Sequence, residues 1–330
     1  MAANILPIFE PIIHGRMYYA FPLSLIDAND RHAQSWIMSR FVQLQSHTLE
    51  QVDRTGIAEL RFAHADHPEC YTDAFEVEAI SMAGMYGSDV TSYIRKAIAL
   101  HRYVYIYVDK FYVSDNPFSG KKHVVQESLI YGDEDGQFHI LGFNRNRRFE
   151  KSVVPHSDIA NGFLHSDTPT IYLLKAKPFD QSAFDLIDIR EQLNRYLLSD
   201  NAGAEHIGES GLERSYGLQV YASLRQSIRN LAERHELVVP NIAYLHILAE
   251  HKKLMHKRLQ GYHGHGVALA SESMLHYQAF EKQLMKLRND LIKYEANHKD
   301  VILQQIDDSL RVIAQSEKQC LMGFLDCIPC

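Results

Sequence analysis

One short segment carries side chains that could bind a metal ion or attack a carbonyl group. It reads HADHPECYTD and contains His64, His67 and Cys70. Imidazole and thiolate are ordinary zinc ligands, but three of them are an incomplete set, which Asp66 or Asp73 would have to complete. A cysteine near histidines can also act as a nucleophile, because a histidine can take the thiol proton. The segment is therefore only a candidate for a metal site or a cysteine nucleophile; an ordinary loop is the favoured interpretation, and we predict no metal site.

A run of β-strand residues occupies the middle of the chain. It is dense in Val, Ile, Tyr and Phe, which fit a pleated surface. Turn residues (Asp, Asn, Pro and Gly) interrupt the run twice, at 114–120 and 132–136. The pattern predicts three consecutive strands, at 103–113, 123–131 and 137–143. Strands joined by such short turns are typical of an antiparallel sheet.

The second half of the chain has a different character. Beyond Pro178, apolar residues recur at spacings of three and four, which is typical of amphipathic helices. The predicted helices cover 185–198, 212–234, 241–260, 271–295 and 299–321. We therefore predict an α+β core at residues 1–178 and a helical region at residues 179–330. The long amphipathic helices also make a homodimer a candidate assembly.

Composition and charge restrict the class of protein. The chain has 330 residues, of which 46% are apolar, as in ordinary globular proteins. Its net charge of −7 argues against non-specific nucleic-acid binding, which needs a basic surface. No apolar run is long enough to span a bilayer, the first residues lack the basic part of a secretory signal, and four cysteines make no disulfide framework. We therefore expect a cytoplasmic protein with no membrane or nucleic-acid partner.

Four segments carry a resemblance to a known family. In chain order they read LHRYVYIYVDKFYV, HVVQESLIYGDEDGQFHILGFN, SYGLQVYASL and HILAEHKKLMHKRL. They resemble papain-fold proteins of thiotemplated natural-product biosynthesis, a family similar to the butirosin acyltransferase and the closthioamide amide synthase. The resemblance covers roughly residues 12 to 260, with loose motifs. It implies an α+β fold with a papain-like antiparallel sheet and helices, followed by a C-terminal helical region.

The resemblance also implies a reaction. Members of such a family are expected to take an acyl group from a carrier-protein thioester onto a cysteine and to pass it to an amine. The implied partners are an acyl or peptidyl carrier protein and a small amine. No cofactor of the chain's own is implied, since the phosphopantetheine arm belongs to the carrier. The expected function is amide-bond-forming acyl transfer in secondary-metabolite biosynthesis.

Two of the three catalytic positions implied by the resemblance hold other residues. The cysteine that opens the first helix matches Met17, the histidine on the second strand matches Gln126, and the orienting residue matches Asn144. A thioether cannot form an acyl-enzyme, and an amide cannot act as a general base. The resemblance therefore implies an altered catalytic centre.

Three alternatives follow from these replacements. His123 could act as the base for direct attack by an amine, although its odd separation from Gln126 puts the two side chains on opposite faces of a regular strand. Only a bulge would bring His123 into the site. Cys70 could be the nucleophile instead. The third alternative is a catalytically degenerate relative that binds a carrier protein or an active paralogue.

Two further groups of residues complete the predicted site. An aromatic cluster in the first helix and an acidic residue of the second strand are candidates for substrate binding, although such aromatics are more often core: Tyr18, Tyr19, Phe21 and Glu127. Basic residues at the ends of adjacent strands could form a rim that docks an acidic carrier, although they could equally be a solvated turn region: Lys121, Lys122, Arg145, Arg147 and Arg148.

Overall fold

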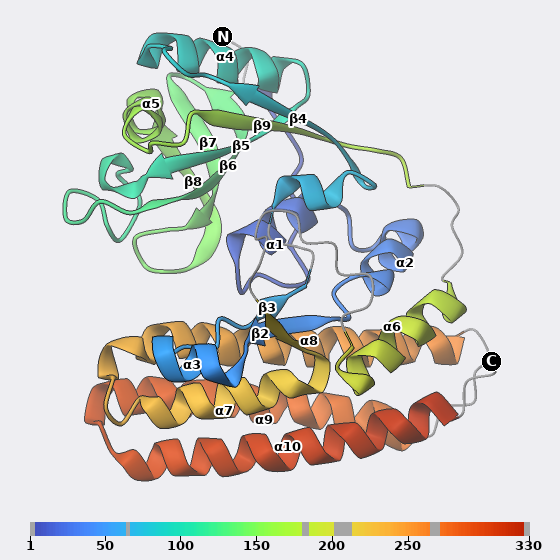
Figure 1. Ribbon diagram of the computed structural model, residues 1–330. Helices are drawn as coiled ribbons and strands as arrows, with labels where there is room; N and C mark the ends of the chain where they lie inside the picture. Colours follow the sequence, from blue (N-terminus) through green and yellow to red (C-terminus); the bar gives the residue numbers. More distant parts are fainter. Residues whose placement is uncertain (1–3, 64–66, 180–184, 201–212, 265–270, 327–330) are drawn as a thin grey trace. The chain divides into compact units, whose positions relative to one another are not determined.

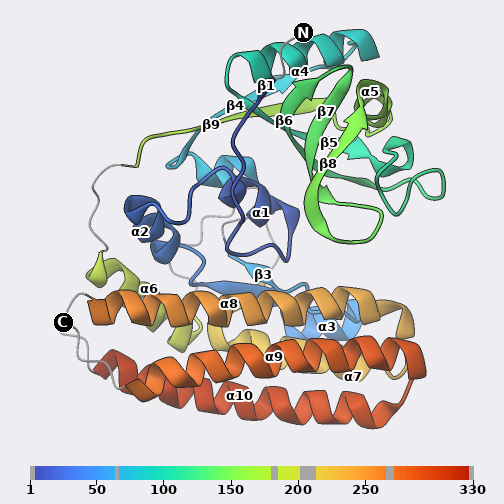
Figure 2. The ribbon, with the colours of Figure 1, turned by 180° about the vertical axis from the view of Figure 1, so that it is seen from behind.

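The computed structural model describes most of the chain and divides it into two compact units (Figures 1 and 2). The described residues are 4–63, 67–179, 185–200, 213–264 and 271–326. Unit 1 comprises Met1–Ala33 and Ala65–Asp180, and unit 2 comprises Gln34–His64 and Gln181–Cys330. The predicted domain boundary after residue 178 lies close to the end of unit 1. The segment Gln34–His64, which the sequence prediction placed in the α+β core, packs with the C-terminal helices.

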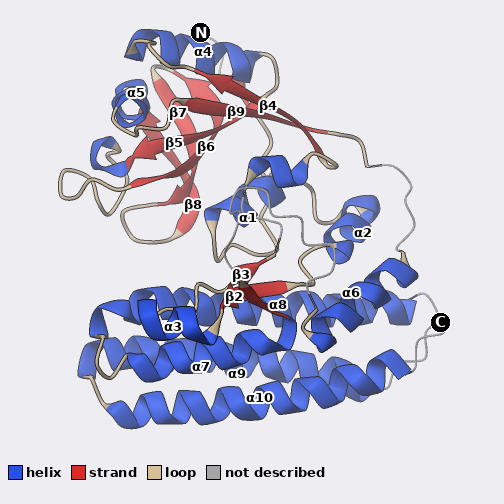
Figure 3. Cartoon of the chain, viewed as in Figure 1, coloured by secondary structure: helices blue, strands red, loops and turns tan. Residues whose placement is uncertain are grey.

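Unit 1 is built on an antiparallel sheet (Figure 3). Its strands, in spatial order, are β4 (Phe75–Ser81), β9 (Thr170–Ala176), β5 (Tyr103–Asp109), β6 (Val125–Glu134), β7 (Gln137–Phe143) and β8 (Phe149–Pro155). A short β1 (Asn4–Ile5) also pairs with β6. The predicted antiparallel sheet is therefore present, and so is a C-terminal helical region. The first predicted strand stops at Asp109, because the next three residues form a 3₁₀ turn, η2 (Lys110–Tyr112), that the Asp109 side chain caps.

Helices cover both faces of this sheet. On one face, Phe21 of α1 (Met17–Ser24) packs edge-to-face on Tyr105, with ring centroids 5.7 Å apart. On the other, Gly162 of α5 (His156–Leu164) lies so close to β5 that a Cβ atom there would be 3.1 Å from the Cβ of Val108. Tyr105 and Val108 have odd separation and so point to opposite faces. α4 (Gly87–Ala99) packs beside α5.

The ladder between β6 and β7 is incomplete. Its pairs run from Glu134 opposite Gln137 to Leu129 opposite Leu141 and end there. The first residues of β6, 125–128, pair only with β5, and the last residues of β7, 142–143, pair only with β8. Two neighbouring strands therefore separate at this end of the sheet, close to where β5 passes into η2.

Unit 2 combines a small sheet with helices (Figure 1). The three antiparallel strands lie in the order β10 (Arg214–Tyr216), β2 (Leu44–His47) and β3 (Arg61–Phe62). The helices are α2 (Arg31–Ser39), which begins in unit 1, α3 (Leu49–Thr55), α6 (Leu186–Leu198), α7 (Val220–Asn230), α8 (Val238–Gly264), α9 (Ser271–Asn297) and α10 (Asp300–Asp326). In the part of the chain that the structure describes, no helix is both long and apolar enough to cross a membrane.

One predicted helix of unit 2 starts later than its sequence pattern indicates. The prediction began at residue 212, but α7 begins at Val220, after β10 and a 3₁₀ turn, η3 (Gly217–Gln219). Gly217 has φ +54, and a Cβ atom there would collide with the carbonyl oxygen of Tyr196. This close approach needs glycine, and the left-handed backbone of Gly217 prevents an α-helix from passing through that point.

Candidate functional site

A small pocket of unit 1 lies where β6 and β7 separate. Its wall combines the start of α1, the 3₁₀ turn after β5 and the open ends of these strands: Met17, Lys110, Val113, Asp115, Asn116, Gln126, Ser128, Ile140, Leu141, Gly142, Phe143 and Ser152. The space open to the centre of a water molecule is about 10 Å³. That is room for roughly one water, so a larger group enters only if part of the wall moves.

Two of the positions that the resemblance implies are catalytic meet at this pocket. Met17 is the first residue of α1, because Arg16 before it has an extended backbone (φ −141, ψ 146). Gln126 is the second residue of β6. Both residues line the pocket. The thioether and the amide occur together there, and neither can supply a nucleophile or a general base.

Asn144, the third implied catalytic position, lies in the turn between β7 and β8 and not in the pocket wall. It is buried, and its Oδ1 accepts hydrogen bonds from the backbone N–H groups of Asn146 (2.9 Å) and Arg148 (3.1 Å). Its Nδ2 donates to Glu150 Oε1. These bonds hold the turn between β7 and β8. Asn144 does not line the pocket, and the ladder that would place it opposite Gln126 has already ended.

His123 also lies outside the pocket wall. It precedes β6, where its Nδ1 is 2.6 Å from Asp109 Oδ2 and its ring stacks on Phe111 at 4.2 Å. Burial opposes ionisation of Asp109, but hydrogen bonds from His123 and from the N–H groups of Phe111 and Val124 bring its pKa below the usual value. The His123 side chain is 65% exposed, and the Asp109 side chain is 3% exposed. The pair is a candidate base only for chemistry outside the pocket.

The structure describes only part of the predicted cluster around Cys70. Cys70 is half-buried in the 3₁₀ turn η1 (Pro68–Tyr71), and Asp73 follows on the surface. The Nε2 of His67 lies 3.1 Å from the hydroxyl of Tyr172. His64 and Asp66 lie outside the described residues. Within the described ranges, Cys70 belongs to no group of three side chains that could hold a metal ion.

The predicted substrate-binding residues divide between core and site. Tyr19 and Phe21 have no exposed surface and belong to the core, and Tyr18 is half-buried with its ring 4.5 Å from that of Tyr19. None of the three lines the pocket. Glu127 lies opposite Tyr107 in the β5–β6 ladder, on the sheet face of Tyr105 against which α1 packs. Burial raises the pKa of Glu127, against the opposing attraction of Lys110 and Arg16.

Lys110 and Ser128 were missed in the sequence analysis. The Nζ of Lys110 donates a 2.5 Å hydrogen bond to the Oγ of Ser128, and both residues are buried and line the pocket. Burial lowers the pKa of Lys110 to about 8, although nearby Glu127 acts in the opposite direction. Two sequence signals could have found the pair. Ser128 follows Gln126 by two residues and so shares its strand face, and a lysine between buried strand residues is uncommon.

The residues of the predicted basic rim lie outside the pocket wall, on two loops close to it. All five residues are exposed: Lys121, Lys122, Arg145, Arg147 and Arg148. They lie on the β5–β6 connection and the β7–β8 turn. An ion pair from Arg145 Nε to Asp115 Oδ1 (3.1 Å) and a hydrogen bond from Asn116 Nδ2 to the Phe143 carbonyl (3.3 Å) join these two loops. Asp115, Asn116 and Phe143 line the pocket, so the basic loops form its edge.

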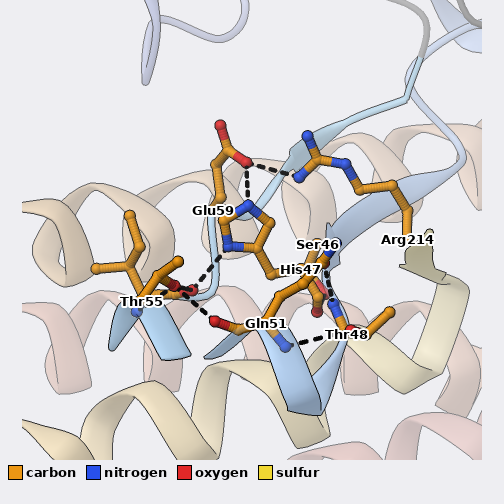
Figure 4. A network of polar contacts seen from close by, with 8 residues as sticks. Ser46, His47, Thr48, Gln51, Thr55, Glu59 and Arg214 are labelled. Carbon is orange, nitrogen blue, oxygen red and sulfur yellow. Dashed lines mark hydrogen bonds and ion pairs between the residues drawn. The ribbon is translucent and has the colours of Figure 1, made fainter. Parts of the chain in front are cut away.

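Unit 2 holds a separate cluster of charged side chains, around β2 and α3 (Figure 4). Glu59 Oε2 lies 2.6 Å from both His47 Nε2 and Arg214 Nη1. The hydrogen bond from His47 and the Arg214 guanidinium lower the pKa of Glu59 to about 2, against the effect of burial. Glu59 has φ +46, which is strained for a residue with a side chain. The cluster is fully paired and links the strands of the small sheet.

Comparison with known proteins adds no assignment. Neither the scan against protein families nor the search of curated proteins gives a match to this chain.

Proposed function

We propose that this chain is an acyltransferase of papain-like fold that forms an amide bond between a carrier-bound acyl group and a small amine, with an altered catalytic centre. The observation that carries the proposal is the pocket at the start of α1. It joins Met17 and Gln126, the positions that the resemblance assigns to nucleophile and base. It also holds Lys110 and Ser128, side chains that can transfer protons.

The edge of the pocket supports a carrier protein as the partner. Carrier proteins are typically acidic, and the basic rim is a complementary surface on a chain of net charge −7. A carrier docked there would bring its phosphopantetheine arm to the pocket that Asp115 and Asn116 border. The arm is part of the carrier, so the reaction needs no cofactor held by this chain.

One observation favours the alternative, a catalytically degenerate relative that binds a carrier protein or an active paralogue. The pocket has room for roughly one water while Met17 forms part of its wall. A binding protein needs the basic rim and no open site. The two proposals share the docking surface and differ in whether acyl groups are transferred.

Carrier binding and amide formation separate these proposals. The full chain is titrated with a holo acyl carrier protein at increasing salt, and then mixed with the acetyl-loaded carrier and benzylamine. We expect binding that weakens as salt rises and amide formed faster than without the chain. The double variant Lys121→Glu/Lys122→Glu should weaken binding, and Lys175→Glu on β9 is the control for an exposed lysine outside the rim.

The outcomes decide between the proposals. Binding without amide formation, for several acyl groups and amines, rejects the acyltransferase in favour of the binding protein. Absence of binding at low salt rejects both.

A further inference from the structure

The Lys110–Ser128 pair has the arrangement of a nucleophile beside its base. The two atoms, Nζ and Oγ, are 2.5 Å apart. Lys110 is 4% exposed and Ser128 is 1% exposed, so bulk water does not compete for this bond. A serine hydroxyl is a weak nucleophile until a base within hydrogen-bond reach takes its proton, and lysine serves as that base in some serine enzymes.

Burial makes Lys110 an amine that can lose its proton near neutral pH. Its Nζ donates to a neutral hydroxyl rather than to a carboxylate. Glu127 of β6 acts on it from the other side of the strand and stabilises the charge, while burial has the larger opposite effect and lowers the pKa to about 8. Asp115, the acidic residue of the pocket wall, is paired with Arg145. The neutral fraction of Lys110 therefore rises as the pH passes through about 8.

We propose that Ser128 is the nucleophile of this pocket and Lys110 its general base, so that the chain takes up an acyl group from a thioester as an ester of Ser128. The inference rests on the proposed acyl transfer and deepens it by naming the atoms that react. It also accounts for the residues at the implied positions, because a serine nucleophile needs neither a cysteine at Met17 nor a histidine at Gln126.

The reaction balances without any further reagent. Neutral Lys110 takes the proton of Ser128 as Oγ attacks the thioester carbonyl. The C–S bond then breaks, and the leaving thiolate takes the proton from Lys110. In the second half, an amine attacks the ester, Lys110 takes a proton from the nitrogen, and the C–O bond breaks as that proton returns to Oγ. The products are an amide, a free thiol and the unchanged chain.

The neighbours of the pair supply two other requirements of acyl transfer. Gln126 lies two residues before Ser128 on the same strand face, and its amide is an N–H donor for the negative oxygen of the intermediate. Met17 forms part of the pocket wall, and the space beside it holds roughly one water. The acyl group must therefore displace the Met17 side chain, which is unbranched and flexible.

A carrier-independent labelling experiment tests the pair. The full chain is incubated with acetyl-N-acetylcysteamine, a small thioester, in the absence of amine, and the modified residue is identified by intact mass and peptide mapping. We expect acetylation of Ser128, at a rate that increases with pH through about 8. Met17→Ala should accelerate it by opening the pocket.

Substitutions at the two residues separate a chemical role from a structural one. Ser128→Ala should abolish labelling, and Ser128→Cys should keep it with a thioester in place of the ester. Lys110→Met should slow labelling by about 100-fold or more and remove its rise around pH 8. Ser157→Ala and Lys175→Met, at exposed positions outside the pocket, are the matched controls. Far-UV circular dichroism of each variant verifies folding.

The outcomes distinguish this inference from the proposed function. If the loaded carrier gives amide but Ser128 is unlabelled in both wild type and Met17→Ala, the pair is rejected and the proposed function stands. If Ser128 is labelled but the chain neither binds a carrier nor forms amide, the pair stands and the proposed function fails. Labelling at Cys70 would reject the pair in favour of a cysteine nucleophile.

Discussion

Among the residues that the structure describes, each unit buries one lysine, and the two lysines have different partners. In unit 2, Nζ of Lys252 lies 2.6 Å from Glu317 Oε1, 3.0 Å from the Tyr196 hydroxyl and 3.0 Å from His251 Nδ1. In unit 1, Nζ of Lys110 donates to Ser128, and the described part of the chain gives it no second hydrogen bond. Lys252 therefore uses all three of its N–H donors, whereas the described hydrogen bonds of Lys110 use one.

The network around Lys252 is closed and purely internal. Glu317 also accepts from the hydroxyls of Tyr196 (3.3 Å) and Tyr221 (2.7 Å). His251 Nε2 faces the carbonyl oxygen of Val42 at 2.8 Å, so Nε2 carries the proton and Nδ1 accepts from Lys252. Burial lowers the pKa of Lys252, but the facing Glu317 acts in the opposite direction.

The partners of a buried lysine indicate its role. A charge whose partners are all in place holds helices together and has no capacity left for chemistry. Burying a charged lysine beside only a hydroxyl and a pocket has a high free-energy cost. The ammonium group can avoid this cost by losing its proton. Lys252 is therefore a structural residue, and Lys110 is the candidate for reaction.

The largest expected effect comes from breaking the closed network. Lys252→Met leaves Glu317 buried without its cation, so we expect the free energy of unfolding to fall by about 3–5 kcal/mol. Urea titration at pH 7 measures it. The double variant Lys252→Met/Glu317→Leu should recover most of this loss, because no unpaired charge remains. Lys257→Met, at an exposed position of the same helix, is the matched control. A loss below about 1 kcal/mol in the single variant would contradict the comparison.

The corresponding change in unit 1 should depend on pH. The pKa of Lys110 is about 8 in the folded chain against an ordinary 10.5. Below pH 8 both folded and unfolded chains carry the charge, and the folded chain bears the cost of burying it. Between pH 8 and 10.5 the unfolded chain binds more protons, so the free energy of unfolding rises with pH. Relative to Lys110→Met, wild type should gain up to roughly 3 kcal/mol over this range.

Urea titrations of both proteins at pH 7 and pH 10.5 measure this gain. All other titrating groups are the same in wild type and Lys110→Met, so their effects cancel in the difference between the two proteins. A difference that does not change with pH would mean that Lys110 keeps its charge in the fold, and the contrast with Lys252 would be lost.

Much of the framework follows from local sequence patterns. Strong periodicity predicted the strands at 123–131 and 137–143 and the C-terminal helices. The structure has strands and helices at these positions. The missed features depend on contacts distant in sequence. The helix predicted from residue 212 is shortened by the approach of Gly217 to Tyr196, and no local pattern contains that distance.

The candidate site was predictable only in part for the same reason. Met17 and Gln126 could be named from the resemblance, and their meeting at one pocket depends on how β6 and β7 separate. Lys110 and Ser128 are 18 positions apart, so their hydrogen bond depends on the pairing of β5 with β6. The odd separation of His123 from Gln126 argued against His123 as a residue of the site, and in the structure it lies outside the pocket wall, beside Asp109.

The partly exposed Glu59 cluster of unit 2 should give a smaller effect than either buried lysine. The pKa of Glu59 is lowered to about 2 from 4.5, so its pairing with His47 and Arg214 stabilises the fold fully above about pH 4.5. That contribution is lost as the pH falls through 2. We expect Glu59→Gln to cost about 1 kcal/mol at pH 7, because its side chain is 35% exposed and screened.

Urea titration at pH 7 and at decreasing pH measures this effect. The difference between wild type and Glu59→Gln should shrink as the solution becomes more acidic. Glu213→Gln, an exposed neighbour of Arg214, is the control and should change little at either pH. A cost at pH 7 as large as that of Lys252→Met would show that exposure is not what separates these clusters.

The smallest effect on stability is expected at the basic rim. Arg145 is 64% exposed and paired with Asp115, so Arg145→Glu should change the free energy of unfolding by no more than about 0.5 kcal/mol. Arg311→Glu on α10, which removes an exposed pair with Asp308, is the matched control. The two variants should differ in titration with a holo acyl carrier protein at low salt, where only Arg145→Glu weakens binding. If Arg145→Glu instead destabilises the fold by more than 1 kcal/mol and leaves binding unchanged, its ion pair serves to hold the two loops together, and the rim is structural rather than a docking surface.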